Sequence, residues 1–179
     1  MAAFAPDNTA TLFKRLMGTN TPIRIPALNL ALTPEEYSAE FLKVLYGYLP
    51  EGIRNDPETG TVITVPAAFN QMQRDATLSA AQMAGIGKVV LMQKPVAAVM
   101  TIMRTRPTDG NFLIYDLGGG TFDIALAQSN AGCVSLFNPC GIAMCGGRDR
   151  DRRLADEIAI PRLLEHFDLL DNFATDARP

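Results

Sequence analysis

The most informative stretch of the sequence is Tyr115-Asp116-Leu117-Gly118-Gly119-Gly120-Thr121-Phe122-Asp123. Apolar runs at residues 112–115 and 122–128 predict two strands joined by three glycines, which is the pattern of a hairpin. Glycine has no Cβ, so backbone N–H groups in such a turn can approach phosphate oxygens closely. Asp116 and Asp123 carry the oxygen ligands that suit Mg²⁺ and its bound waters. The stretch is typical of a phosphate and metal site, although a glycine hairpin with two solvated aspartates would have the same composition.

Strands alternate with helices before this hairpin, which predicts an α/β protein whose sheet the hairpin makes mixed. Strands are expected at residues 61–65 and 89–92, the second of them buried, and helices at residues 33–49, 70–85 and 95–103. Thr33 and Asn70 each stand three residues before a Glu or Gln, which is the pattern of a capping box. The inward face of the first helix is predicted to consist of Tyr37, Phe41, Val44, Leu45 and Tyr48.

The chain after the hairpin is expected to form a third strand at residues 133–137, a glycine-containing loop at 138–147 and a helix at 148–167. Pro161 should kink or restart that helix, because proline lacks a backbone N–H group. Core contacts are expected from Leu154, Ile158 and Leu163. The polar, turn-rich residues 105–110 form the best internal boundary.

Composition excludes several classes of protein. The chain has 179 residues, of which 47% are hydrophobic and 20% charged, so it is of neither the disordered nor the fibrous type. A net charge of -3 without a Lys- or Arg-rich stretch argues against a nucleic-acid partner. The chain does not open with a basic region before an apolar run, and it holds no apolar segment of transmembrane length, so we expect neither export nor a membrane partner.

The three cysteines, Cys133, Cys140 and Cys145, are spaced neither as a disulfide framework nor as a common zinc site. We interpret them as reduced thiols, which indicates a cytoplasmic protein. Cys140 and Cys145 are expected to be small buried hydrophobic residues. His166, the only histidine, is assigned a packing or surface role.

Several segments occur in the order of one protein family. The stretch around the three glycines resembles the second phosphate loop of the seventy-kilodalton heat-shock chaperones (DnaK-type), within the actin and sugar-kinase ATPase superfamily. Residues 62–70 with 73–77 resemble the strand and connecting helix of that family, and residues 94–98 resemble the segment that follows. Asn8-Thr9 with Lys14-Arg15-Leu16-Met17-Gly18 is similar to the family stretch that carries its catalytic lysine.

The resemblance implies an actin-like ATPase fold of ribonuclease-H-like topology, with a mixed sheet, flanking helices and an incomplete two-lobe domain. Residues 1–104 would form part of the first lobe, and residues 105–179 would begin the second lobe with the phosphate-binding hairpin. The implied cofactors are ATP or ADP and Mg²⁺, and the implied partners are co-chaperones and client polypeptides. The expected function is an ATP-binding and ATP-hydrolysing module of a molecular chaperone, as a fragment or a reduced form.

The resemblance also implies roles for individual residues. Lys14 would lie near the γ-phosphate, where an ammonium group orients the attacking water and stabilises the transferred charge. Asp116 and Asp123 would face the metal and its water. The three turn glycines would cradle the phosphates, and Thr121 would place its hydroxyl near the γ-phosphate.

Two further pairs of residues have alternative interpretations. Gly146 and Gly147 resemble a family element beside the phosphates, but a helix-entry turn would explain them equally well. Pro66 and Arg74 match positions that relay the nucleotide state to the partner domain in this family. Without that relay, they would be a strand terminator and an exposed charge on a helix.

Three departures from the family affect these expectations. Lys94 stands where the family has a glutamate close to the metal-bound water. This change of two charge units should repel Mg²⁺ and weaken hydrolysis. The glycine-rich hairpin that supplies the family's first phosphate loop is missing, and the chain ends at Pro179, before the family's adenosine-contacting elements.

Two alternatives compete with an active ATPase. A catalytically inactive interaction fragment would keep the fold and bind co-chaperones or itself. An exposed sheet edge and exposed apolar surface would favour such self-association as a homo-oligomer. A sugar or acetate kinase relative would fit the hairpin but not the signature at residues 62–70.

Overall fold

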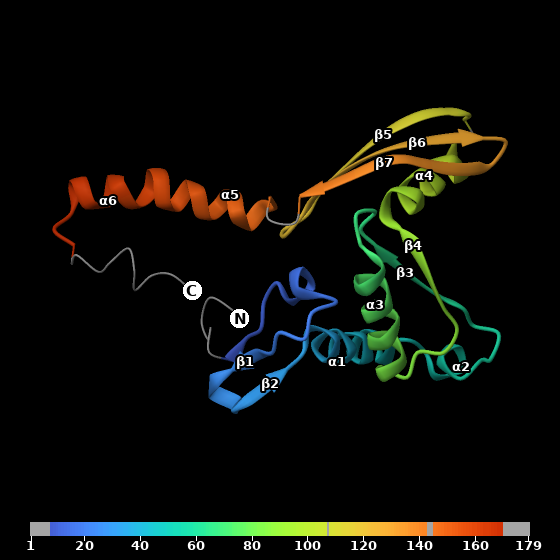
Figure 1. The fold of residues 1–179 in the computed structure, drawn as a ribbon, viewed down its shortest axis with the longest axis horizontal. Coiled ribbons are helices and arrows are strands. Elements are labelled where there is room, and N and C mark those ends of the chain that lie inside the picture. The colour runs from blue at the N-terminus through green and yellow to red at the C-terminus, as the bar shows by residue number, and fades with distance from the viewer. Residues whose placement is uncertain (1–7, 107, 143–144, 170–179) are drawn as a thin grey trace.

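The computed structural model describes residues 8–106, 108–142 and 145–169 of the chain. Its strands are β1 (Ile23–Ile25), β2 (Leu30–Leu32), β3 (Thr61–Val65), β4 (Val89–Gln93), β5 (Gly110–Leu117), β6 (Phe122–Asn130) and β7 (Cys133–Ile142). Its α-helices are α1 (Pro34–Gly47), α2 (Glu51–Arg54), α3 (Gln71–Met83), α4 (Lys94–Thr105), α5 (Gly147–Leu154) and α6 (Ile160–His166). Other helical segments are the 3-10 turns η2 (Phe13–Leu16) and η3 (Pro26–Leu28) and the π-helical η4 (Ala155–Ala159). Figure 1 shows how these elements follow one another in space.

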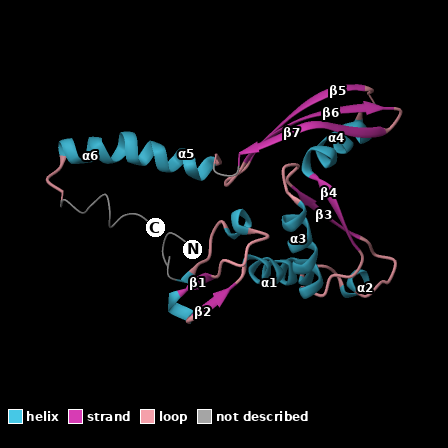
Figure 2. Cartoon of the chain, in the orientation of Figure 1, coloured by secondary structure: helices cyan, strands magenta, loops and turns pink. Residues whose placement is uncertain are grey.

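The strands of the described residues form three separate sheets (Figure 2). β1 and β2 are antiparallel, β3 and β4 are parallel, and β5, β6 and β7 form an antiparallel sheet in that order. The α/β class and the hairpin are confirmed. The expectation of one mixed sheet is not, because no hydrogen-bonded strand pair joins β3 and β4 to β5 in the described residues. Helix α4 lies between them instead and packs against strands of both sheets.

The predicted capping boxes of α1 and α3 are confirmed. In α3, Asn70 Oδ1 accepts from the Gln73 N–H at 3.0 Å, and Gln73 Oε1 accepts from the Asn70 N–H at 3.0 Å. Thr33 and Glu36 make the same reciprocal pair at the start of α1. These contacts satisfy N–H groups that the first helical turn would otherwise leave unpaired. Helix α3 is the crossover that connects the parallel strands β3 and β4. Gly85 follows the end of this helix in a left-handed conformation at φ +74°.

The core of the first half lies between α1, α3 and the β3–β4 pair. Helix α3 presents the buried alanines Ala76, Ala80 and Ala81 toward this core. Such small side chains let neighbouring helices approach closely, and α1 packs directly on α3. Leu42 and Tyr46 of α1 cover the buried cluster that contains Ala81. The helices and the strand pair therefore form one packed unit.

The predicted inward face of α1 is largely wrong. The exposed members of that face are Phe41, Val44, Leu45 and Tyr48. Tyr48 is 79% exposed, whereas Ala39, on another side of the helix, is 2% exposed. The helix carries two apolar stripes, and the alanines of α3 accept the stripe with Ala39 and Leu42, where the two backbones can come closest. Helical spacing alone does not distinguish the two stripes.

The β5–β7 sheet has one covered and one open face. Helix α4 packs against one face, as Figure 1 shows. The other face, which we call the apolar sheet face, exposes Leu113, Tyr115, Leu117, Leu126, Phe137 and Ile142. Cross-strand register places these side chains in adjacent rows, for example Leu113 beside Leu126 and Leu126 beside Phe137. The expectation of exposed apolar surface is confirmed.

Strand β7 is longer than predicted, and the loop expected at residues 138–147 is wrong at its beginning. The strand continues through Pro139 to Ile142. A break in the β6–β7 register between Ile124 and Leu126 accommodates the proline. Proline is tolerated here because β7 is an edge strand and the irregular register removes the need for its missing N–H group. Cys140 lies on this edge and is exposed, so its predicted burial is also wrong.

The final helical segment extends away from the three sheets (Figure 1). The predicted core contacts of Leu154, Ile158 and Leu163 are wrong, because all three side chains are exposed. The predicted restart at Pro161 is confirmed, since α6 begins directly after the π-helical η4 with the proline in its first turn. No helix among the described residues combines the length and apolar character needed to cross a membrane.

Candidate phosphate site

The turn between β5 and β6, residues 118–120, is held by hydrogen bonds on its carbonyl side. The Gly118 N–H donates to the Thr121 carbonyl at 2.9 Å and closes the turn. The Gly118 carbonyl accepts from the Gly147 N–H at 2.9 Å. The Gly119 carbonyl accepts from the Arg148 N–H at 3.0 Å. The first turn of α5 is thus docked on the glycine turn.

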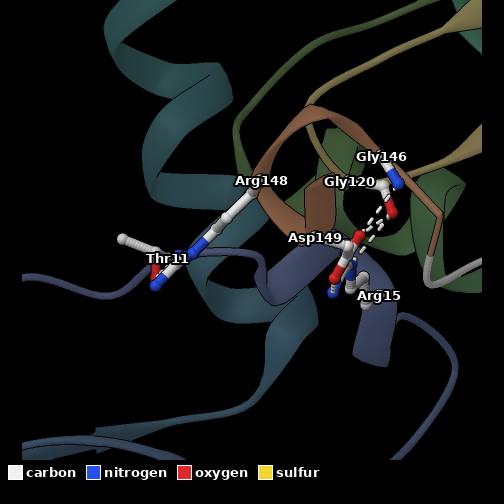
Figure 3. Close-up of polar contacts among 6 residues, drawn as sticks. All are labelled: Thr11, Arg15, Gly120, Gly146, Arg148 and Asp149. Atoms are coloured by element: carbon white, nitrogen blue, oxygen red, sulfur yellow. Dashed lines mark hydrogen bonds and ion pairs between the residues drawn. The ribbon is translucent and has the colours of Figure 1, made fainter. Parts of the chain in front are cut away.

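Arg15 of η2 binds the third carbonyl of the turn. Its Nε and Nη2 atoms donate to the Gly120 carbonyl at 3.0 and 2.7 Å (Figure 3). In a trans peptide unit the C=O of one residue points opposite to the N–H of the next, and no peptide bond of the described chain is cis. The N–H groups of Gly119, Gly120 and Thr121 therefore point away from Arg15 and α5. These three N–H groups donate to no other described residue.

Arg15 also joins the turn to the start of α5. Its Nη1 donates to Asp149 Oδ1 at 3.2 Å and its Nη2 to Asp149 Oδ2 at 2.5 Å. The same carboxylate accepts from the Gly146 N–H at 2.8 Å. The Arg15 hydrogen bond, followed by that of Gly146, lowers the pKa of Asp149 below its usual value. Figure 3 shows this group with Arg148, whose Nη1 donates to Thr11 Oγ1 at 2.9 Å.

Gly146 lies against the backbone of the turn. A Cβ atom at this position would lie within 2.5 Å of atoms of Gly119 and Gly120. Only glycine permits this approach. At Gly147 a Cβ would meet nothing closer than 3.9 Å. The structure therefore places both glycines beside the predicted phosphate loop, and the N–H group of Gly147 is taken by a turn carbonyl.

The carboxylates Asp116 and Asp123 are directly opposite each other on β5 and β6. Lys94, the first residue of α4, donates from Nζ to Asp116 Oδ2 at 2.8 Å. Asp123 is only 7% exposed, and its Oδ2 lies 3.4 Å from the Thr121 hydroxyl. Burial raises the pKa of Asp123, and the negative charge of Asp116 raises it further, whereas Lys94, Thr121 and Lys14 act in the opposite direction. Asp116 is thus a partly exposed carboxylate paired with Lys94, whereas Asp123 is a buried carboxylate with a raised pKa.

Lys14 lies close enough to this pair to interact with it. Loss of water around its ammonium group lowers the pKa of Lys14, although part of the side chain is exposed, and the charge of Lys94 lowers it further. Asp116 and Asp123 raise that pKa. The Lys14 Nζ also lies 5.9 Å from the ring centroid of Phe69. The structure therefore brings the predicted catalytic residues Lys14, Asp116, Thr121 and Asp123 together, with Lys94 among them.

Pro66 and Arg74 form no side-chain hydrogen bond or ion pair with the carboxylate pair among the described residues. Pro66 is buried directly after β3, and its carbonyl accepts from the Phe69 N–H at 3.2 Å. Arg74 lies on α3 beside a pocket lined with Val65 and Gln93. Its Nε atom is buried and finds no hydrogen-bond partner in the described part of the chain. Neither residue takes part in the hydrogen bonds described above for the glycine turn.

Comparison with known proteins identifies the family. The Hsp70 protein family matches residues 6–166 of the chain. The chain belongs to the Hsp70 family. Its predicted resemblance to the heat-shock chaperones is confirmed. The aligned region is consistent with a partial Hsp70 ATPase domain.

Individual relatives are chaperones of the same family. The chain is 37% identical over 170 residues to the chaperone protein HscA homolog of Acidithiobacillus ferrooxidans, an alignment that covers 84% of the chain and 27% of the relative. The HscA homolog of Aromatoleum aromaticum is 38% identical over 167 residues, covering 83% and 27%. The chaperone protein dnaK of Cyanophora paradoxa is 36% identical over 159 residues, covering 88% and 25%. The chain thus spans about a quarter of the length of these relatives.

The sequence analysis did not identify Arg15 as a member of this site. Arg15 was part of the segment that resembles the family's lysine stretch, but nothing in its spacing indicated that its partners lie 105 and 134 residues later. The nearest signal was its position next to Lys14. Adjacent residues of a tight helical turn point in different directions, so one is able to face the carboxylates and the other the turn carbonyls.

Proposed function

We propose that the chain is the nucleotide-binding module of an Hsp70-type chaperone and that it holds the phosphates of ATP or ADP at the glycine turn. The observation that carries this proposal is the orientation of the Gly119, Gly120 and Thr121 N–H groups. All three carbonyls on the other side of the turn are already bonded by Arg15 and α5. Three N–H groups directed to one side are the arrangement that binds a phosphate oxygen.

Lys14 is proposed to complete the phosphate site and to act in hydrolysis. An ammonium group held near the turn stabilises the charge of the transferred phosphoryl group. The Thr121 hydroxyl is proposed to lie near the γ-phosphate, and Asp116 and Asp123 to position water there. Gly146 and Gly147 support the turn from behind.

Mg²⁺, which the family resemblance implies, does not fit this set of residues. One oxygen of Asp116, Oδ2, is already bound by the Lys94 ammonium group, whose positive charge would repel a cation beside that carboxylate. Asp123 is buried, and a Cβ on the neighbouring Gly141 would overlap its Oδ1, so little room surrounds that carboxylate. No group of three or more metal-binding side chains occurs among the described residues. We therefore derive no catalytic step through a metal, and expect slow turnover.

Partners of the whole chaperone belong to the same proposal. Co-chaperones and client polypeptides are proposed partners, with Pro66 and Arg74 as the positions through which nucleotide state is relayed. The three cysteines are free thiols, in keeping with the proposed cytoplasmic location. The division into lobes at residues 104 and 105 is part of this proposal too.

A second candidate is an interaction fragment without turnover, which the apolar sheet face favours. Its residues are exposed on a sheet of three strands, and the rows of this face hold no charged side chain. A second copy of the chain would present the same uncharged face and bury it through a two-fold contact. The Lys94–Asp116 ion pair favours loss of turnover in this alternative.

Calorimetric titration of the chain with ATP tests the proposed function. We expect saturable binding, weakened by about tenfold or more in Lys14→Met, because a charge-assisted contact contributes roughly 1.5–3 kcal/mol. Lys43→Met is the matched control, because Lys43 is an exposed residue of α1 paired with Glu40. Absence of binding, or equal losses in both variants, would contradict the proposal.

A further inference from the structure

We propose that Lys94 is a built-in cation that takes the place of a divalent metal, so that the site binds nucleotide phosphates as metal-free anions. This inference rests on the proposed nucleotide binding and concerns its ionic requirement. It follows from the poor fit between the carboxylates of the site and Mg²⁺.

The position of Lys94 supports this role. Lys94 directly follows β4 and opens α4, with Pro95 behind it, so its backbone is fixed by the strand on one side and the helix on the other. Its Nζ lies 2.8 Å from Asp116 Oδ2. A positive charge at the first residue of a helix is unfavourable for the helix dipole. The ion pair with Asp116 offsets this cost and holds the ammonium group beside the turn.

The Lys94 ammonium group is accessible to a ligand. The side chains of Lys94 and Asp116 are 30% and 32% exposed. An ammonium group has three N–H donors, and Asp116 is its hydrogen-bond partner in the described residues. Two donors are left to meet phosphate oxygens. The Lys94 ammonium group is therefore held in place by Asp116 and still accessible to a ligand.

The charges of the site also match a metal-free anion. Lys14 and Lys94 balance Asp116 and Asp123, and the two ammonium groups lie close enough to repel each other. A phosphate group near both would relieve this repulsion. A divalent cation would instead add positive charge beside Lys94. With glutamate at position 94 the same site would hold an excess of negative charge, which is the condition that attracts a divalent cation.

The experiment compares ATP binding by calorimetry in EDTA and in excess Mg²⁺. For the wild-type chain we expect an affinity in EDTA at least equal to that in Mg²⁺. Lys94→Glu and the neutral Lys94→Gln should weaken binding in EDTA by about tenfold or more, and only Lys94→Glu should recover affinity with Mg²⁺. Lys88→Glu is the matched control for the charge change, because Lys88 lies exposed just before β4, beside Glu58.

Mn²⁺ alone, followed by electron paramagnetic resonance, provides a readout without nucleotide. The wild-type chain and Lys88→Glu should take up no Mn²⁺, whereas Lys94→Glu should take up one ion. Binding of ATP by the wild-type chain only in the presence of Mg²⁺, or uptake of Mn²⁺ by it, would overturn this inference and leave the proposed function intact. No ATP binding under either condition would overturn both.

Discussion

Arg15 binds both carboxylate oxygens of Asp149, a residue 134 positions later in the chain. The same guanidinium group binds the Gly120 carbonyl. One side chain thus joins η2, the glycine turn and the start of α5. Because the turn carbonyls are fixed from this side, the N–H groups of the turn are directed to the other side, where we place the phosphate.

Asp149→Asn should change the acid dependence of stability. The pKa of Asp149 is lower in the folded chain than its usual value of 3.8, chiefly through Arg15. Such a carboxylate stabilises the fold at pH values above its unfolded pKa, and this contribution is lost as the pH falls through the lower, folded pKa. We therefore expect the melting temperature of the wild-type chain to fall as the pH is lowered through that acidic range. The melting temperature of Asp149→Asn should fall less.

Arg15, the partner of Asp149, provides a second variant for this pH experiment. Arg15→Ala should flatten the acid limb as Asp149→Asn does, because both remove the same contact. Arg148→Ala should keep the wild-type slope, since its side chain bonds to Thr11 instead. An unchanged slope in Asp149→Asn would refute the coupling.

Gly146→Ala should destabilise the docking of α5 on the turn. Its Cβ would lie 2.4 Å from the Gly119 carbonyl oxygen, and relief of such overlap typically costs about 1–3 kcal/mol. Gly147→Ala is the matched control, because its Cβ meets only ordinary contacts at 3.9 Å. Urea unfolding followed by circular dichroism measures both. Equal stability of the two variants would argue against the close approach.

Gly119→Ala should weaken ATP binding without loss of stability. A Cβ at this position meets nothing within 4 Å in the chain itself. It would, however, occupy space that a phosphate needs beside the neighbouring N–H groups. We expect an affinity lower by about tenfold or more, or roughly 1.4 kcal/mol, at an unchanged melting temperature. A variant that binds ATP as well as the wild-type chain would place the phosphate elsewhere.

Leu113→Glu should reduce self-association. Leu113 is 57% exposed on the apolar sheet face, on the edge strand β5 and opposite Leu126 of the central strand. A charge there would have to be desolvated when two copies meet. Sedimentation velocity should show a concentration-dependent dimer for the wild-type chain and for Val44→Glu, a control on the exposed stripe of α1, but a monomer for Leu113→Glu. A wild-type chain that is monomeric at high concentration would rule out this contact.

Local signals in the sequence predicted much of the fold. The capping boxes at Thr33 and Asn70, the stop at Gly85 and the hairpin around the three glycines all depend on residues close together in the chain. The order of strands and helices follows from them. The family resemblance added the grouping of Lys14 with Asp116, Thr121 and Asp123, which spacing alone does not give.

Features that depend on distant residues were not predictable in the same way. Which stripe of α1 is buried depends on the alanines of α3, and the extension of β7 past Pro139 depends on a register break against β6. The exposure of Leu154 depends on where the whole final helix lies. The Arg15–Asp149 contact likewise joins residues 134 positions apart, which no local pattern relates.

Phosphate binding at residues 118–120 is tested most directly on the amide groups of the turn themselves. In nitrogen-15 labelled protein, addition of ATP should shift the amide signals of Gly119, Gly120 and Thr121 more than those of Gly52 and Gly60, which lie far along the chain from the turn. Adenosine, which lacks phosphates, should leave the three turn signals in place. Turn signals that stay unchanged while ATP binds, or that shift equally with adenosine, would contradict phosphate binding at this turn.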